Sequence, residues 1–178
     1  TETDPRMTPQ SVQAPAVADG DDFVINGAKL FVDNFSVADQ CLVVCRTAAA
    51  SAANDGLSLF LVDCDSPGIS HRDLVTLAKD NHSEVTFSDV RVPGSRLIGD
   101  LNEGAPIAEN LIELATALLC AQMLGATRKD MEMAVEWSKY RKAFGQPIGA
   151  FQSLQHMCAD MLMWIDGGDL LTFEAVWK

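Results

Sequence analysis

In the first hundred residues, hydrophobic positions come in short runs separated by polar, glycine-rich or proline-containing breaks. Three of these runs predict strands, at residues 40–46, 56–64 and 83–93. A further stretch, DFVINGAKLFV at residues 22–32, carries Asn26-Gly27 between two apolar runs. This pair predicts a hairpin turn, because both turn positions need a positive φ. No helix-length segment separates the strands, so the pattern predicts an antiparallel sandwich or barrel rather than a βαβ fold.

Beyond "LIGDLNEGAP" the apolar period becomes helical, and we expect one long helix over residues 107–140. Within it, "LIELATALLCAQMLGA" is apolar on most sides, which is typical of a helix inside a bundle or an oligomer interface. The stretch is too short, and with Glu113 and Gln122 too polar, for a membrane span. A second helix is expected from about Phe151 to the last residues. This helix is still running at Trp177-Lys178 with no cap or breaker, and the opening TETDPRMTPQ likewise looks like the interior of a longer sequence, so the chain is expected to be truncated at both ends.

Composition narrows the choice of partners. The 13 Lys and Arg against 25 Asp and Glu give a net charge of −12, which argues against nucleic acid and anionic membranes. The five cysteines form no CxxC pair and lie in apolar runs. We interpret them as buried reduced thiols, which favours a cytoplasmic location. No metal site is expected, since the three histidines lack ligand spacing with the cysteines. The sequence contains no GxGxxG or GxxxxGK loop, so no Rossmann or P-loop cofactor site is expected.

The connection between the two predicted helices, YRKAFGQPIGAFQ at residues 140–152, is unusually rich in chemistry for a loop. Basic residues gather in and before it: Arg128, Lys129, Lys139, Arg141 and Lys142. The pattern alone fits either a solvated helix face or a local anion site.

The order of elements and this loop together resemble the acyl-CoA dehydrogenase family. The matching stretches are DFVINGAKLFVDN, LSLFLVDCDSPGI, SEVTFSDVRVP followed by LIG, the long helix, and RKAFGQPIGAFQ followed by ADM. The resemblance covers nearly the whole chain. It implies the family's middle β domain at residues 1–104 and the start of its C-terminal, up-and-down four-helix domain at residues 105–178. The chain as a whole is then α+β.

Such a resemblance implies an FAD-dependent oxidoreductase, a flavoprotein of fatty acid or lipid catabolism. The implied reaction is α,β-dehydrogenation of an acyl-CoA thioester with hydride transfer to FAD. It also implies a flavoprotein as electron acceptor, and a homo- or hetero-oligomer, dimer or tetramer, built through the helical domain. The family's base glutamate usually lies later in the C-terminal domain, so the catalytic base of this chain is unknown.

In the family, the loop between these helices binds the adenine-diphosphate half of an FAD held by the neighbouring subunit. By this resemblance, Arg141 contacts the pyrophosphate and Phe144 packs against the adenosine end. Phe151 and Gln152 supply packing and hydrogen bonding at the start of the next helix. The residues alone leave open a capped interhelical turn in which Arg141 lies along apolar surface.

The flavin-ring end departs from the family pattern. Phe31 stands where the family has a tryptophan that packs on the ring, and Asp33 where it has a threonine that hydrogen-bonds near flavin N5. An ionised carboxylate accepts hydrogen bonds and cannot donate one. Asp33 therefore either opposes the reduced flavin or caps the turn with Asn34. Thr1-Glu2 matches the start of a family stretch along flavin and substrate, although the glycines of that stretch are missing.

On the long helix, Glu113 matches a position where some relatives place an acidic substrate contact. Thr116 and Ala115 stand where the family has an arginine and, in some members, the catalytic glutamate. Glu113, Thr116 and Cys120 form one polar line that borders a ligand site or faces solvent or a partner helix. Three hypotheses follow: an acyl-CoA dehydrogenase, a degenerate non-catalytic subunit that completes a partner's FAD site in a hetero-oligomer, and a non-enzymatic interaction module.

Overall fold

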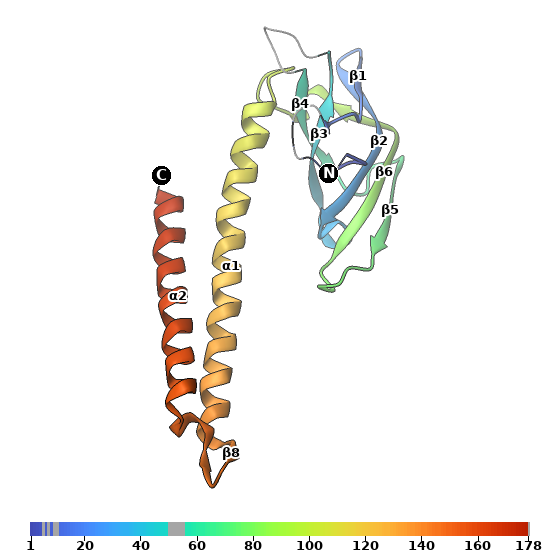
Figure 1. The fold of residues 1–178 in the computed structure, drawn as a ribbon. Helices are drawn as coiled ribbons and strands as arrows, with labels where there is room; N and C mark the ends of the chain where they lie inside the picture. The colour runs from blue at the N-terminus through green and yellow to red at the C-terminus, as the bar shows by residue number, and fades with distance from the viewer. Residues whose placement is uncertain (5, 7, 9–10, 50–55, 178) are drawn as a thin grey trace. The chain divides into compact units, whose positions relative to one another are not determined.

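The computed structural model describes residues 1–4, 6, 8, 11–49 and 56–177. The chain divides into two compact units, Thr1–Glu109 and Asn110–Lys178. The first unit is built mainly of strands and the second of two long helices (Figure 1). The predicted α+β fold, antiparallel sheets followed by long helices, is confirmed.

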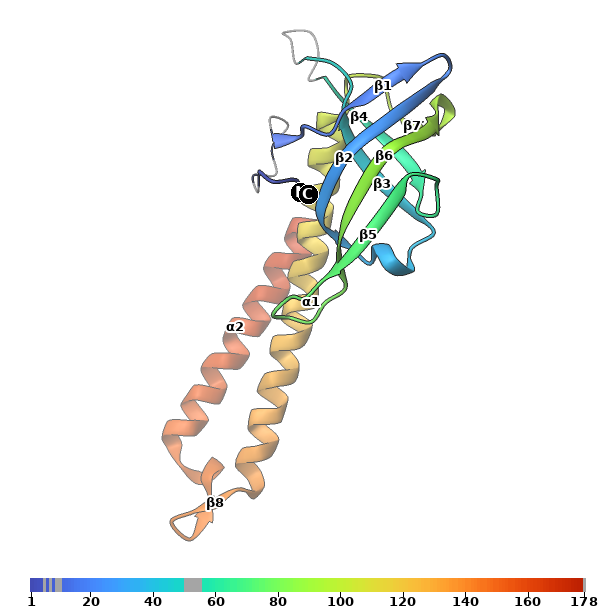
Figure 2. The same cartoon turned by 90° about the vertical axis from the view of Figure 1, so that its right-hand side faces the viewer.

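In the described part of the first unit, the strands form two antiparallel sheets (Figure 2). One sheet has the order β1-β2-β6-β5, and the other has the order β3-β4-β7. The strands of the larger sheet are β1 (Ala16–Asp19), β2 (Asp22–Asp33), β5 (Ile69–Leu74) and β6 (His82–Pro93). Those of the smaller sheet are β3 (Gln40–Arg46), β4 (Leu57–Asp63) and β7 (Leu97–Ile98).

The core of this unit combines apolar side chains from both sheets with one from the short 3-10 helix after β2. Its buried members are Ala16, Ile25, Phe35, Val43, Cys45, Phe60, Val62, Val85, Phe87, Val90 and Val92. β6 supplies the last four, which alternate along the strand on either side of one irregularity between Phe87 and Val90. Burial of this apolar surface is what holds the two sheets face to face.

Asn26-Gly27 does not form the predicted hairpin turn. β2 continues through the pair, and the turn lies instead at Gly20 and Asp21, between β1 and β2. Gly20 has a φ of 66°, the left-handed conformation that a tight hairpin turn needs.

Asn26 and Gly27 occupy an irregularity in the pairing of β2 with β6. The Asn26 side chain accepts a hydrogen bond from the Asp89 amide (2.8 Å) and donates one to the Asp89 carboxylate (3.0 Å). Asp89 has a φ of 53°, and this extra residue shifts the buried face of β6 from Phe87 to Val90. A Cβ on Gly27 would lie 3.0 Å from the Ala14 Cβ. The pair therefore serves a bulge and a close chain crossing.

The second unit contains most of α1 (Ala105–Tyr140) and α2 (Gln152–Trp177), which run antiparallel and side by side (Figures 1 and 2). Both helices begin within two residues of the predicted positions. Arg128 on α1 ties them together, because its guanidinium lies 3.2 Å from the Asp166 carboxylate and 2.5 Å from that of Asp169. Gly168 of α2, next to Asp169, allows close packing of the two helices, since a Cβ on Gly168 would lie 2.6 Å from the Leu124 side chain.

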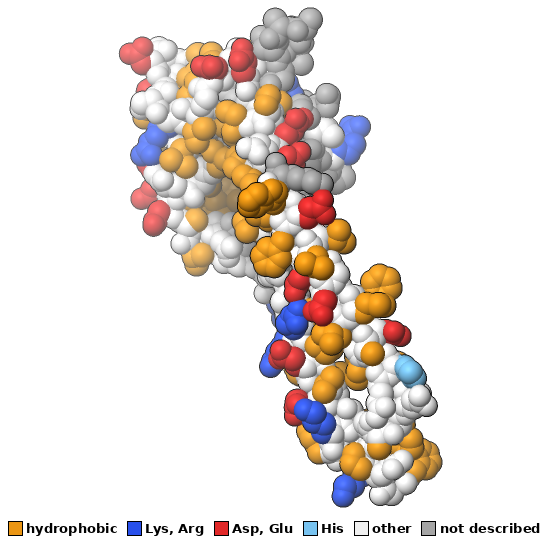
Figure 3. All heavy atoms as spheres, turned by 90° about the vertical axis from the view of Figure 1, so that its left-hand side faces the viewer, with side chains coloured by type: hydrophobic (Ala, Val, Ile, Leu, Met, Phe, Trp, Pro, Cys, Tyr) orange, Lys and Arg blue, Asp and Glu red, His pale blue; other side chains and the backbone are white. Residues whose placement is uncertain are grey.

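The apolar part of α1, predicted to lie inside a bundle or an oligomer interface, is exposed in this chain alone. By length and composition alone, α1 could cross a membrane: an 18-residue stretch of it has a mean hydropathy of 1.4. None of that stretch is buried. Core helices of soluble proteins have the same composition, so this alone does not indicate a span. Hydrophobic side chains line the exposed surface of both helices (Figure 3). They include Leu114, Leu118, Met123, Met163, Trp164, Leu170 and Phe173.

The five cysteines are free thiols, as predicted, but their predicted burial holds only in part. Cys45 is buried, Cys41, Cys64 and Cys158 are half-buried, and Cys120 is exposed on α1. In the described residues no group of three or more His, Cys, Asp or Glu side chains is placed to hold a metal ion.

Candidate functional site

Phe31 lies in a bulge near the end of β2. Lys29 pairs with Val85 of β6 and Val32 pairs with Ser83, so two residues of β2 oppose one of β6. Phe31 has a φ of 54°, and the residue is 56% exposed. A bulky residue at positive φ is uncommon, and such conformations concentrate at functional sites. The bulge presents an aromatic ring outward, where it can cover a ligand.

Asp33 faces His82, the first residue of β6, rather than capping the turn. Its carboxylate lies 2.8 Å from His82 Nδ1, although the geometry is not that of a hydrogen bond. The other ring nitrogen, Nε2, is hydrogen-bonded to Asp80 at 3.0 Å. The predicted cap with Asn34 is not formed, since Asn34 makes no side-chain capping hydrogen bond to the 3-10 helix that follows.

The ring of His82 also meets Phe31 edge-on, with 6.1 Å between the centroids. His82 is thus a member of this site that sequence reasoning missed. The available signal was strand pairing, because His82 begins a predicted strand that pairs with the end of the strand carrying Phe31 and Asp33. What this corner offers a ligand is an aromatic ring beside a carboxylate that can only accept hydrogen bonds.

In the helical unit, the connecting loop forms a small hairpin of β8 (Lys142–Ala143) and β9 (Gln146–Pro147). Phe144 and Gly145 form its turn, with φ values of 53° and 85°, as a two-residue turn with both positions at positive φ requires. Phe144 is 95% exposed at the tip and meets Phe151 edge-on, with 6.1 Å between ring centroids. The two aromatic residues predicted at this site therefore lie together.

Arg141 follows the last residue of α1 and is fixed through its backbone. Its amide donates to the Trp137 carbonyl (3.0 Å), and its own carbonyl accepts from the Ile148 amide (2.8 Å). Its side chain is exposed and makes no hydrogen bond or ion pair within the described residues. The backbone of Arg141 is therefore fixed at the base of the hairpin, and its guanidinium donors are available to an anion.

The other basic residues of the cluster divide into paired and unpaired ones. Arg128, Lys129 and Lys139 each pair with carboxylates on the helices. Lys142, like Arg141, is exposed and forms no ion pair in the part of the chain that the structure describes. The uncompensated positive charge is thus concentrated at the hairpin. Of the two sequence-based alternatives, this favours the anion site over a solvated helix face.

Gln152 is the exposed first residue of α2, directly after Phe151. The first turn of a helix has free N–H groups and the positive end of the helix dipole, both of which favour an anion. Gln155, one turn further, donates a hydrogen bond to the Gly149 carbonyl (2.9 Å) and fixes the short 3-10 turn before α2.

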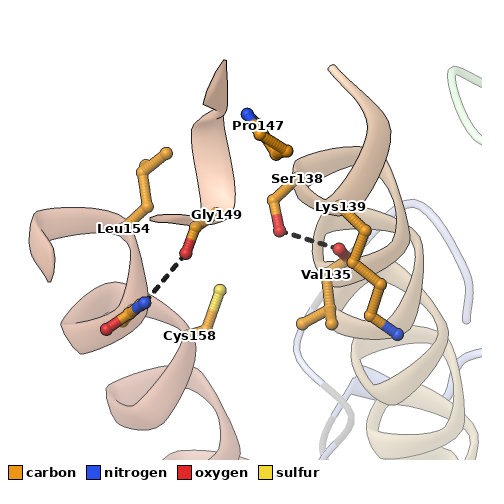
Figure 4. A pocket seen from close by; sticks show the side chains of 8 residues that line it. Val135, Ser138, Lys139, Pro147, Gly149, Leu154 and Cys158 are labelled. Carbon is orange, nitrogen blue, oxygen red and sulfur yellow. Dashed lines mark hydrogen bonds between the residues drawn. The ribbon is translucent and has the colours of Figure 1, made fainter. Parts of the chain in front are cut away.

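A cavity of about 360 Å³ lies between the end of α1 and the start of α2. Its lining residues are Val135, Ser138, Lys139, Pro147, Gly149, Leu154, Gln155 and Cys158 (Figure 4). Gly149 crosses Ser138 closely, since a Cβ on Gly149 would lie 3.0 Å from the Ser138 carbonyl oxygen. None of the predicted cofactor residues lines this cavity, so the cavity is not the predicted cofactor site.

Glu113 lies on α1 far from the hairpin. Arg141 is 28 positions after Glu113, which corresponds to about 42 Å along a helix. Glu113 is exposed, and in the described residues it has no hydrogen bond or ion pair. The Thr116 hydroxyl donates to the Ile112 carbonyl (2.7 Å) of its own helix. The polar line of Glu113, Thr116 and Cys120 therefore faces outward, and neither Glu113 nor Thr116 is joined to another site residue.

Two protein-family models match this sequence. Residues 1–90 match the acyl-CoA dehydrogenase middle domain, and residues 102–178 match the acyl-CoA dehydrogenase C-terminal domain.

Individual proteins give the same result. The probable acyl-CoA dehydrogenase YngJ of Bacillus subtilis is 32% identical over 93% of this chain, and the match covers 44% of that protein. The cyclohexane-1-carbonyl-CoA dehydrogenase of Geobacter metallireducens is 33% identical, with the same two coverages. A solved complex of glutaryl-coenzyme A dehydrogenase with glutaryl-CoA has a TM-score of 0.92 and 28% identity, covering 98% of this chain and 45% of that one. The chain thus spans less than half the length of these relatives.

Proposed function

Because the chain belongs to the acyl-CoA dehydrogenase family, we propose that it takes part in an FAD-dependent dehydrogenation of an acyl-CoA thioester. The relatives are more than twice as long. The proposal therefore concerns an activity to which these two units contribute, rather than one that they complete.

The observation that carries the proposal is the uncompensated charge at the hairpin between α1 and α2. Arg141 and Lys142 have no carboxylate partner in the described residues, whereas the three other basic residues of the cluster do. A planar guanidinium pairs well with phosphate oxygens, and the start of α2 adds free N–H groups nearby. The residues present thus fit the diphosphate of FAD.

Each residue of the hairpin has a defined role in this proposal. Arg141 binds the pyrophosphate, Phe144 packs against the adenosine end, and Phe151 supports Phe144 from the side. Gln152 offers its amide at the start of α2. The Phe144 ring is almost fully exposed on its own chain, which suits a contact made to the cofactor of a neighbouring subunit.

At the ring end, the fit is partial. Phe31 is placed by its bulge to cover an aromatic ring, but the Asp33 carboxylate cannot donate the hydrogen bond expected near flavin N5. When bound, FAD accepts the hydride from the substrate β carbon. The contribution of this chain is to bind and orient. The α-proton requires a base held within hydrogen-bond reach, and no residue of this chain is proposed for that role. Glu113 is proposed only as a substrate contact.

The apolar faces of α1 and α2 support assembly through the helical unit. Exposed hydrophobic surface of this extent marks a protein–protein interface. We propose a homo- or hetero-oligomer, an acyl-CoA substrate and a flavoprotein as electron acceptor. The free thiols support a cytoplasmic location.

A second candidate is a degenerate subunit that completes the FAD site of a partner without performing the chemistry itself. Two observations favour it. Asp33 faces His82 and can only accept hydrogen bonds, and the Thr116 hydroxyl donates its hydrogen bond to a carbonyl of its own helix. In this case the hairpin serves the partner's cofactor, whereas the ring end of this chain serves none.

Flavin content distinguishes the two. The protein is purified after expression alone and after co-expression with a candidate partner subunit, and the absorbance of bound flavin per chain is measured. Yellow protein from expression alone supports the enzyme. Colourless protein that becomes yellow only with a partner supports the degenerate subunit, and no flavin under either condition contradicts both.

A further inference from the structure

The bulge that carries Phe31 has an unusual source of hydrogen bonds. Bulged residues leave the regular ladder, and their backbone groups need other partners. Leu30, the neighbour of Phe31, donates its amide to the Thr1 carbonyl (2.8 Å), and its own carbonyl accepts from the Thr1 backbone nitrogen (3.1 Å). Thr1 thus supplies the hydrogen-bond partners that the bulge needs.

The next residue, Glu2, anchors this segment through a nearly buried ion pair. Its carboxylate lies 2.6 Å from Lys29 Nζ, and the two side chains are only 10% and 12% exposed. It also accepts hydrogen bonds from the amides of Gln13 (2.8 Å) and Ala14 (3.2 Å). A buried carboxylate with these partners is satisfied, whereas loss of Lys29 would leave it an uncompensated buried charge.

Lys29 links the two sheets as well. Besides Glu2, its ammonium donates to the Val44 carbonyl of β3 (2.6 Å). It stands on β2 immediately before the bulge, two residues from Phe31. One side chain therefore holds residues 1–2, the smaller sheet and the start of the bulge together.

We propose that the Glu2–Lys29 ion pair positions Phe31, by holding residues 1–2 against the bulge of β2. The contact of Phe31 with FAD rests on the proposed function, but the positioning itself does not. Phe31 is half-exposed and lies at positive φ. Without the ion pair, residues 1–2 are no longer held in place, and Leu30 beside Phe31 loses its hydrogen bonds to Thr1.

The test is hydrogen exchange, followed amide by amide by NMR, on the flavin-free full chain. Lys29→Met is expected to speed exchange at Leu30, Gln13 and Ala14 by about tenfold or more, because their partners are held by the ion pair. The β4 amides of Phe60 and Val62 are expected to stay within about twofold. Lys29→Arg, which keeps the charge and can reach the same carboxylate, is expected to restore protection. The matched control is Lys129→Met, which removes an exposed ion pair on α1.

Two results would overturn the proposal. The first is unchanged exchange at Leu30 in Lys29→Met, and the second is equally accelerated exchange at Phe60 and Val62, which would make the pair a general stabiliser. If Lys29→Met does not fold, Glu2→Gln replaces it with the same expectation at Leu30 and the same contrary results.

A second readout uses protein loaded with FAD, where Lys29→Met is expected to change the visible circular dichroism of the flavin. A wild-type protein that takes up no FAD, either alone or with a partner subunit, contradicts the proposed function, and the exchange comparison then still decides the positioning role.

Discussion

Phe144 and Phe151 meet edge to face across the turn of the α1–α2 hairpin, with ring centroids 6.1 Å apart. This pairing leaves one aromatic ring supported from the side and exposed on its faces. An aromatic group held in this way is preorganised to pack against a planar ligand, because little side-chain entropy remains to be lost.

Phe144→Ala is therefore expected to weaken FAD binding without lowering stability. Phe144 is 95% exposed, so its removal costs the fold almost no buried apolar surface. Loss of a stacking contact of about 1 kcal/mol corresponds to an affinity reduction of about fivefold. Isothermal titration of the flavin-free protein with FAD, together with thermal unfolding, checks both parts. A lowered Tm with unchanged affinity would contradict the assignment.

Glu2 makes the stability of the β unit depend on acidity. Burial raises the pKa of Glu2, but the hydrogen bond and charge of Lys29 and the amides of Gln13 and Ala14 outweigh it, so that the pKa lies below its usual value. A carboxyl with a lowered pKa in the folded state contributes stability above its unfolded pKa, near 4.5. That contribution is lost as the pH falls through the folded pKa.

The expected result is a smaller loss of Tm for Glu2→Gln than for the wild type when unfolding is followed from pH 7 down to about pH 3. The same comparison with Glu132→Gln, which removes an exposed carboxylate on α1, should show little difference from the wild type. Parallel curves for Glu2→Gln and the wild type would show that Glu2 carries no acid-sensitive stability.

The thiols are expected to differ strongly in reactivity. Burial raises the pKa of Cys45 to about 12, and burial with the neighbouring Cys64 raises that of Cys41 to about 12. Since the thiolate is the nucleophile, both should react slowly with iodoacetamide at pH 8, whereas the exposed Cys120 should react first. Mass spectrometry of partly labelled protein gives the order. Early labelling of Cys45 would contradict its burial in the core.

Much of the fold followed from the sequence, because periodicity is a local property. The family resemblance was confirmed, and the two long helices and the strands β3, β4 and β6 lie where alternating or helical patterns predicted them. β5 was missed because its centre is His71, Arg72 and Asp73, three polar residues without an apolar face. β1 was missed because it is only four residues long.

The misplaced hairpin shows the limit of local signals. Asn-Gly tolerates positive φ equally well in a turn and in a bulge, and only the pairing partner decides between them. The partner here is Asp89, more than sixty residues away. The same reason hid His82 and Lys29: their contacts with Asp33 and Glu2 depend on register and chain crossing, which a single sequence does not specify.

At the candidate FAD site, the sequence predicted which residues to consider but not which of the basic side chains are paired with carboxylates. Three of the five clustered basic residues are neutralised by carboxylates on the helices, and only the structure shows that Arg141 and Lys142 are not among them. The roles of Arg141, Phe144, Phe151, Gln152, Phe31, Asp33 and Glu113 remain predictions that experiment decides.

The most direct test of the account is the affinity of Arg141→Ala for FAD, measured in the assembly that binds flavin. A charge-assisted hydrogen-bonded contact is worth about 1.5–3 kcal/mol, so the affinity is expected to fall by about tenfold to a hundredfold. Arg72→Ala is the matched control, because Arg72 is an exposed arginine already paired with Glu84 in the β unit, and it should leave the affinity unchanged. An Arg141→Ala protein that binds FAD as tightly as the wild type would contradict the central claim that this hairpin holds the cofactor's diphosphate.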